Sequence, residues 1–315
     1  MKAVYIQGRC VREWSAFAQC EACATECPVG AIKLSKTPLV DDRCTGCGIC
    51  MRVCPTEALV ASEPYSEIAK RVPIVDGVAL VRCGFEVNCI GHVDESLLYH
   101  ALGRGAKAVK VVHCGKCPRG VDVERERGRI LRLGLPVEFE EASHAPVPGE
   151  VRRGEKPLDL IKRYVEVKEI IKREGVLLVR GVPEKRALLN ASNPPPSLYV
   201  MKIVDPQLCD YLGVCAAVCP TGALRWDGKG ALKYTPALCV KCKNCITACN
   251  AIKNAEAPPE NPHAEVTLVS FKLVKCKECG ALFPYKGEDI CPSCKRAEEE
   301  LQSWFGKGAR TRRFV

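Results

Sequence analysis

Residues 44–55 read CTGCGICMRVCP, four cysteines spaced C-x2-C-x2-C-x3-C with a proline directly after the last. Three other stretches share this design, in which a dense turn of cysteines precedes a short helical piece, then Pro or Asn, then an apolar exit. They form two pairs, CEACATECPVGAI (20–32) with CTGCGICMRVCPTEAL (44–59), and CDYLGVCAAVCPTGAL (209–224) with CVKCKNCITACNAI (239–252). The chain therefore contains an internal repeat, with a first module at 1–66 and a second module at 200–262.

The 23 cysteines dominate the composition of this 315-residue chain. Their number is odd, the chain is long, and most of them stand in C-x2-C or C-x3-C steps, whereas disulfide frameworks are typical of small secreted proteins. One tight turn of this spacing directs two thiolates at the same ion. The pattern therefore indicates metal ligation.

The bulk composition is that of a globular protein of two to four domains, with 47% hydrophobic and 27% charged residues. No apolar run approaches the ~20 residues of a membrane span. The first residues, MKAVYIQGRC, are strand-like and lack the apolar stretch of a signal peptide, so we expect a cytoplasmic location. Sparse Gln and Met with abundant Lys, Arg and Glu favour a thermophilic source.

The formal net charge of +10 would by itself suggest a nucleic-acid partner. That charge counts every cysteine as neutral, although metal-bound cysteines are thiolates. Six sites of about −2 each would contribute about −12 and leave the metallated chain near neutrality. The aromatic content of 6% is also low for base stacking. A nucleic-acid role is therefore disfavoured.

The run at 44–55 is complete, and its spacing specifies two different sites. Three cysteines on one tight loop occupy three corners of an iron–sulfur cubane, while the cysteine before proline ligates the neighbouring cluster. Both modules resemble the two-cluster bacterial ferredoxins in this arrangement. The resemblance implies one [4Fe-4S] cluster on Cys27, Cys44, Cys47 and Cys50.

The partner cluster of the first module departs from that family. Its ligands would include Cys20, Cys23 and Cys54, but the family's first cysteine falls at Phe17. Cys10 lies upstream of that position and has no other assignment. We therefore expect Cys10 to fill the open corner of this [4Fe-4S] cluster, with a buried free thiol as the alternative.

The second module carries a comparable departure. The resemblance implies a [4Fe-4S] cluster on Cys219, Cys239, Cys242 and Cys245. The other set contains only Cys209, Cys215 and Cys249, because Leu212 stands at the second cysteine position. We expect a [3Fe-4S] cluster there, as in the similar seven-iron ferredoxins. The alternative is a labile [4Fe-4S] cluster that borrows the carboxylate of Asp210.

The segment between the modules, 67–145, predicts a small α/β domain. Strands are expected at 77–83, 106–114 and 135–141, and helices at 94–105, with Asp94 as N-cap, and 123–134. This βαβαβ order puts cysteines at the carboxyl ends of two strands, where α/β folds place their sites.

A Cys89-x-Gly-x-Val-Asp stretch, the helix after it, the Gly-Ala at 105–106 and a strand that ends in cysteines mark residues 74–140. With these features the segment resembles the delta, iron–sulfur subunit of the F420-non-reducing hydrogenases that feed heterodisulfide reductases. The resemblance implies a [2Fe-2S] cluster on Cys83, Cys89, Cys114 and Cys117, although the cysteine spacings differ from that family. His92 and His113 stand beside ligands and could replace a cysteine, as in Rieske centres, but a structural role is the favoured interpretation. A redox-active disulfide is a further alternative for these cysteines.

The remaining segments are a linker, a ribbon and a tail. Residues 146–199 predict a helical and Pro-rich linker, with an amphipathic helix at 157–175 and a stiff stretch at 190–197. Residues 263–300 carry two knuckle-like turns typical of a zinc ribbon, with rubredoxin-like iron as the alternative, and 301–315 is a basic tail. The predicted zinc ligands are Cys276, Cys279, Cys291 and Cys294.

Together these motifs predict an α+β multidomain protein with three [4Fe-4S] clusters, one [3Fe-4S], one [2Fe-2S] and one zinc. The sequence has no Walker A loop, G-x-G-x-x-G fingerprint or C-x-x-C-H haem site. We therefore predict an electron-transfer subunit of a larger cytoplasmic oxidoreductase complex, with a flavoprotein, hydrogenase or heterodisulfide-reductase-like partner. The alternatives are an enzyme that uses the open corner at Leu212 and a nucleic-acid-associated zinc-ribbon protein.

Overall fold

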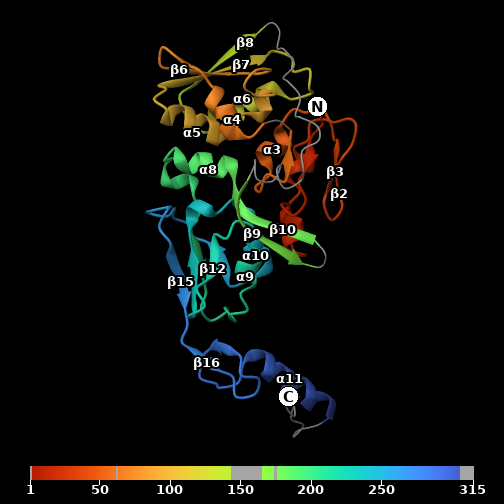
Figure 1. Cartoon of the computed structure of the whole chain (residues 1–315), viewed down its shortest axis with the longest axis vertical. Coiled ribbons are helices and arrows are strands. Elements are labelled where there is room, and N and C mark those ends of the chain that lie inside the picture. Colours follow the sequence, from red (N-terminus) through yellow and green to blue (C-terminus); the bar gives the residue numbers. More distant parts are fainter. Residues whose placement is uncertain (1, 62, 143–164, 174–175, 306–315) are drawn as a thin grey trace.

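The computed structural model describes residues 2–61, 63–142, 165–173 and 176–305. Figure 1 shows an elongated molecule with the α/β sheet at one end and the ribbon at the other. The first module packs beside the α/β sheet, and the second module lies between the first module and the ribbon. Helix and strand make up 28% and 26% of the described residues, which is consistent with the predicted α+β class.

The two modules have the same topology, so the repeat in sequence is also a repeat in structure. In each, the first strand pairs antiparallel with the last, and a hairpin lies between them. Short helices follow the cysteine turns. The first module comprises β1 (Val4–Tyr5), α1 (Val11–Trp14), α2 (Ala22–Thr25), β2 (Ile32–Leu34), β3 (Pro38–Val40), α3 (Ile49–Val53) and β4 (Leu59–Val60).

The second module has one extra strand, β15, which extends its hairpin to a three-stranded sheet of order β12-β13-β15. A second hydrophobic core, separate from the main one, lies within this module and includes Leu224, Leu232 and Tyr234. The elements of the second module are β11 (Lys202–Val204), α9 (Val214–Ala217), β12 (Leu224–Trp226), β13 (Ala231–Tyr234), η3 (Pro236–Leu238), α10 (Asn244–Ala248), β14 (Ile252–Asn254) and β15 (Val266–Ser270).

Residues 63–142 form a four-stranded sheet of order β5-β6-β7-β8. β6 pairs parallel with β7, and β7 with β8, with helices in the connections. The strands and helices occur where the sequence predicts them, and the Asp94 carboxylate accepts a hydrogen bond from Ser96 N at 2.8 Å, which caps α5. The elements are α4 (Tyr65–Arg71), β5 (Ile74–Val75), β6 (Val78–Arg82), η1 (Ile90–His92), α5 (Glu95–Gly103), β7 (Ala108–Cys114), α6 (Val123–Leu131) and β8 (Val137–Ala142).

The core of this sheet continues into the first module. Val81, Val109 and Val111 are buried from the sheet, and they belong to one apolar cluster with Ile49 and Met51 of α3. Because one apolar cluster includes buried side chains from both units, the α/β sheet and the first module share a single hydrophobic core.

The predicted helix at 157–175 is wrong where the structure describes it. Residues 165–173 form a strand, β9 (Val165–Arg173), and 157–164 lie outside the described residues. β9 pairs antiparallel with β10 (Val176–Pro183). The apolar residues of 165–171 fit a strand as well as a helix, and the β-branched partner strand VLLVRGVP supplies the inter-strand hydrogen bonds that favour a hairpin.

The hairpin leads into α8 (Glu184–Ala191) and then η2 (Pro196–Leu198) within the predicted linker. Beyond the second module, a further hairpin of β16 (Leu273–Lys275) and β17 (Leu282–Pro284) precedes the C-terminal helix α11 (Pro292–Phe305). None of the helices in the described ranges has the length and apolarity needed to cross a membrane.

Candidate metal centres

The cysteines predicted for the first cubane surround one small apolar cavity. Cys27, Cys44, Cys47 and Cys50 all line it, together with apolar residues such as Ile32. Backbone N–H groups point at two of the sulfurs, from Ala31 to Cys27 at 3.2 Å and from Ala3 to Cys44 at 3.3 Å. This cage of soft sulfur donors and amide dipoles fits an iron–sulfur cluster.

Burial makes thiolates costly in this cage unless a cation is bound. It raises the pKa of Cys47 to about 11, and the charges of Cys27 and Cys44 add to the shift. Iron compensates this cost because it stabilises the thiolate form directly.

Cys10 lies with the partner set of the first module. It is the N-cap of α1, is 8% exposed, and packs in one small cluster with Cys54 and Ala58. Burial raises the pKa of Cys10 to about 12, and the thiolates of Cys54 and Cys20 raise it further. The side chain of Phe17, by contrast, is 63% exposed and stands outside the core.

Cys23 lies close to the same sulfurs. Burial raises its pKa to about 12, with further contributions from Cys54 and Cys20. Cys10, Cys20, Cys23 and Cys54 therefore lie near enough for their charges to interact, although α1 separates Cys10 from the others along the chain. That the four bind one cluster stays a prediction.

In the second module, Cys219, Cys239, Cys242 and Cys245 line a second small cavity. Lys202, only 3% exposed, lines it too. Burial raises the pKa of Cys245 to about 11, and the nearby Lys202 cation counteracts the shift. The site therefore has the same four-sulfur cage as the first module, with a buried cation beside it.

The three remaining cysteines of this module, Cys209, Cys215 and Cys249, also lie together. Burial raises the pKa of Cys215 to about 12, and the charges of Cys249, Cys245 and Cys209 add to the shift. Leu212 is 55% exposed, and its amide donates to the Asp210 carboxylate at 3.1 Å. That bond holds Asp210 in a local turn of the ligand loop.

The middle set lines a wider cavity of about 240 Å³. Cys83 and Cys114 stand at the ends of the adjacent parallel strands β6 and β7, and Cys89 and Cys117 complete the set, with their sulfurs 3.2 Å apart. Thr45 of the first module also lines this cavity. Four sulfurs around one cavity fit a small iron–sulfur cluster.

The two histidines beside this set do not line the cavity. His92 is fully buried with its ring 5.1 Å from that of Tyr65, and burial lowers its pKa to about 4. His113 Nδ1 lies 3.1 Å from the carbonyl of Cys114, and its ring packs near Phe139. The His92 side chain is therefore engaged in packing, and the His113 side chain in packing and hydrogen bonding, around the site.

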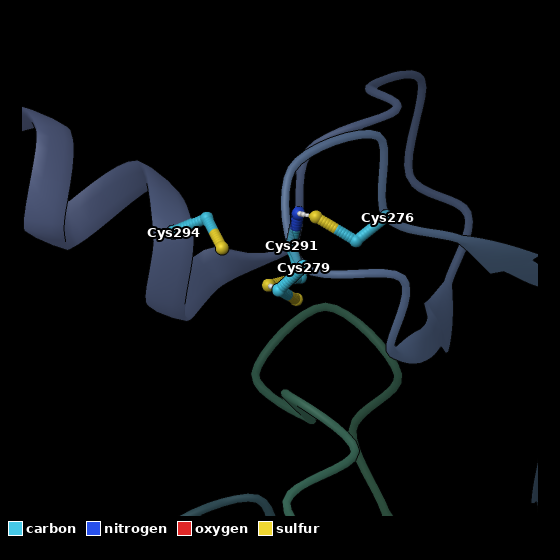
Figure 2. Close-up of side chains that lie close together, drawn as sticks. All are labelled: Cys276, Cys279, Cys291 and Cys294. Carbon is cyan, nitrogen blue, oxygen red and sulfur yellow. Dashed lines mark hydrogen bonds between the residues drawn. The ribbon is translucent and has the colours of Figure 1, made fainter. Parts of the chain in front are cut away.

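The ribbon cysteines form the tightest group. The sulfurs of Cys276, Cys279, Cys291 and Cys294 all lie within 4.8 Å of one another, and they converge from the hairpin turn and the start of α11 (Figure 2). Tetrahedral zinc at a Zn–S distance of about 2.3 Å requires sulfurs about 3.8 Å apart. The group therefore fits a single metal ion.

The five predicted cluster sites, which are the middle set and the two sets of each module, lie in series along the molecule. At the first junction, Thr45 Oγ1, from the ligand loop of the first module, donates to Arg119 O at 2.9 Å. Asn88, beside Cys89, donates to Gly46 O at 2.8 Å. These contacts join the middle set to the cubane set of the first module.

Within each module, the two sets are joined covalently. Cys50 and Cys54 stand at the two ends of α3 and belong to different sets, and Cys54 N donates to Cys50 O at 3.2 Å. In the second module, Cys215 and Cys219 likewise belong to different sets and are joined by a short stretch of chain. Between the modules, Asn244 Nδ2 donates to Val11 O at 3.0 Å. Each of the five sets is therefore linked to the next by a covalent segment or a hydrogen-bonded contact.

Helix α8, which the sequence analysis did not locate, holds the two modules together. Lys185 Nζ donates to the carbonyls of Arg52 and Cys54, both at 2.6 Å, at the end of α3. Arg186 reaches the other way and donates through Nε to Ala237 O at 2.9 Å. The adjacent basic pair KR at 185–186 was the available sequence signal, but it resembles any exposed charged pair.

Buried Glu57 binds the first residues of α8. Its carboxylate accepts from the amides of Glu184 at 2.9 Å and Lys185 at 3.0 Å. Burial raises its pKa to about 7, and the Lys185 cation opposes the shift.

A cleft of about 560 Å³ opens where the modules meet α5 and α8. Cys20 of one set and Cys239 and Cys242 of another line it. Lys241 and Lys243 line it as well, and both are exposed. The cleft therefore gives solvent access to ligands of two neighbouring sets.

Comparison with known proteins identifies the two repeats. Residues 38–60 and 202–225 each match the model of the 4Fe-4S binding domain. The second match includes the run in which Leu212 replaces a cysteine. Neither a curated protein nor a solved structure matches the chain.

The chain is thus an iron–sulfur protein of the electron-transfer kind, built on two ferredoxin-type modules with [4Fe-4S] clusters. The matched segments lie outside 74–140, so the resemblance of that region to the delta subunit has no support from the comparisons.

Proposed function

We propose that this chain is a multi-cluster relay that carries electrons between redox partners in a larger oxidoreductase complex. The observation that carries the proposal is the succession of five cysteine sets, from the α/β sheet through both modules, with contacts that link each set to the next. Clusters supply the redox chemistry, while the protein sets their spacing, burial and hydrogen bonding. The order is the middle set, the two sets of the first module, and then the two sets of the second.

The proposed ligands follow the sets that the structure brings together. Cys10 completes the fourth corner of the Cys20, Cys23 and Cys54 site, because it is buried among them whereas Phe17 is exposed. The Leu212 site holds [3Fe-4S], because Asp210 is tied to its own turn. The middle site holds [2Fe-2S] on its four cysteines, and the ribbon holds zinc.

The proposed partners are catalytic redox subunits, of flavoprotein, hydrogenase or heterodisulfide-reductase type. The middle site lies at one end of the series, so a partner that docks on the α/β sheet would exchange electrons with the relay there. The proposal uses all 23 cysteines as metal ligands and none in a disulfide, which favours a reducing compartment, and we therefore propose the cytoplasm.

The test is anaerobic purification of the full chain followed by metal analysis and EPR during stepwise reduction. The proposal predicts about 17 iron ions and one zinc per chain, and electron uptake at several distinct potentials. After rapid reduction, electrons should redistribute among the clusters without any added substrate. A fully loaded chain whose clusters do not exchange electrons would refute the relay.

A further inference from the structure

One buried residue stands directly before the third cysteine of each complete ligand loop. In the first module this residue is Ile49, before Cys50, and in the second it is Asn244, before Cys245. Both begin a short helix, α3 or α10, and both are almost fully buried, at 3% and 1% exposure. An isoleucine and an asparagine thus occupy equivalent buried positions in two copies of one fold.

Each of these residues touches the neighbouring unit of the series. Ile49 packs on Gly91 of η1, two residues after Cys89 of the middle set. A Cβ at Gly91 would lie only 2.7 Å from Ile49 Cγ1, so the Ile49 side chain packs directly on the Gly91 backbone at a distance that only glycine permits. The position before the third cysteine therefore forms one of the contacts between the α/β sheet and the first module.

Asn244 makes the corresponding contact between the modules, by a hydrogen bond instead of apolar packing. Its Nδ2 donates to Val11 O at 3.0 Å, and Val11 follows Cys10 directly. A weaker contact of 3.5 Å reaches Val218 O, beside Cys219. A buried polar side chain needs such partners, because an amide without them is costly in an apolar interior.

Asn244 directly precedes Cys245, so its side-chain hydrogen bond begins one residue from a proposed cluster ligand. Ile49 stands in the same position before Cys50 in the first module. Asn244 therefore connects a cluster ligand of the second module, through its own side chain, to the residue that follows Cys10 in the first.

We propose that Asn244 is a positioning residue that sets electronic coupling and spacing between the Cys10 set and the Cys245 set. This inference rests on the proposed relay. The hydrogen bond from Nδ2 to Val11 O supplies a bonded route across the interface and holds the two ligand loops in register. Ile49 holds the preceding junction by packing.

The test compares the intact chain with Asn244→Ala and Asn244→Leu. Leucine fills the side-chain volume and resembles Ile49, but it cannot donate a hydrogen bond. Thr247→Ala is the matched control, because Thr247 lies on the same helix and its hydroxyl donates only to carbonyls of α10, with Asn244 O at 3.1 Å. Metal content and midpoint potentials are measured first, and then freeze-quench EPR follows electron redistribution between the modules after rapid reduction.

Both Asn244 variants should keep their iron and midpoint potentials and should redistribute electrons between the modules severalfold more slowly than the wild type. Thr247→Ala should match the wild type. If Asn244→Ala loses its clusters, the leucine variant decides the question. A wild-type rate in a fully loaded leucine variant would overturn the role of the hydrogen bond. Absence of redistribution in the wild type would instead overturn the relay itself, so the two failures are distinguishable.

Discussion

Replacement of Arg186 by methionine should loosen the attachment of α8 to the second module without loss of a cluster. The guanidinium is 6% exposed and donates to Ala237 O at 2.9 Å and to Pro236 O at 3.2 Å. It also lies 4.5 Å from the centre of the Tyr199 ring. Methionine keeps much of the apolar stem but removes both hydrogen bonds and the cation.

The size of the effect follows from what remains bonded. After the substitution, Ala237 O still accepts from Asn190 Nδ2 at 2.9 Å, and Pro236 O still accepts from Cys239 N at 2.9 Å. Neither buried carbonyl oxygen is therefore left without a donor. The stability lost in the variant is that of two hydrogen bonds from a charged donor. Each such bond contributes about 1.5–3 kcal/mol. We expect the two bonds together to contribute less than the sum of their maxima, so the free energy of local opening should fall by about 2–4 kcal/mol in the variant.

Amide hydrogen exchange of the metal-loaded chain measures this directly, because it reports the free energy of local opening. Exchange of the Leu238 and Cys239 amides in and after η3 should be roughly thirtyfold to several hundredfold faster in the variant. Arg225→Met is the control, since its ion pair with Glu265 is half exposed and contributes about 0–1 kcal/mol. Equal exchange in the two variants would refute the assignment of α8 as the inter-module clamp.

Four further predictions concern the sites themselves. Cys10→Ala should reduce the iron content and abolish one [4Fe-4S] signal, and an unchanged spectrum would show that Cys10 is a free thiol. Leu212→Cys should convert the three-iron site to [4Fe-4S], so the EPR signal of the oxidised three-iron cluster should disappear and one iron per chain should be gained. The raised pKa of Glu57 means that its contribution to stability is greatest below about pH 4.5 and is lost as the pH rises to about 7. Glu57→Gln should therefore make the unfolding free energy less dependent on pH in that window, and an identical slope in both proteins would contradict this. A zinc chelator should increase hydrogen exchange in β16, β17 and the start of α11 while the visible iron–sulfur absorbance stays constant, and bleaching at the same rate would contradict a separate zinc site.

The sequence alone determined those features whose causes are local. A C-x2-C-x2-C loop directs its sulfurs to one centre through the turn it makes, so the cubane ligands Cys44, Cys47 and Cys50 were predictable without tertiary information. The same holds for the ribbon cysteines, whose two knuckle turns predict a four-sulfur site that the structure brings within 4.8 Å. Alternating and helical periodicity likewise predicted the strands and helices of the α/β sheet.

Tertiary structure decided what depends on contacts between distant segments. Residues 165–173 became a strand because β10 offers a pairing edge, and the apolar pattern of that segment was compatible with either a strand or a helix. The bonds of α8 to both modules and the order of the five sets each join residues far apart in the chain. Spacing along the sequence carries no information about such pairs, since their meeting is set by the packing of whole units. For the same reason, only the folded chain shows that Asn244 and Ile49, at one position of the repeat, face different neighbours.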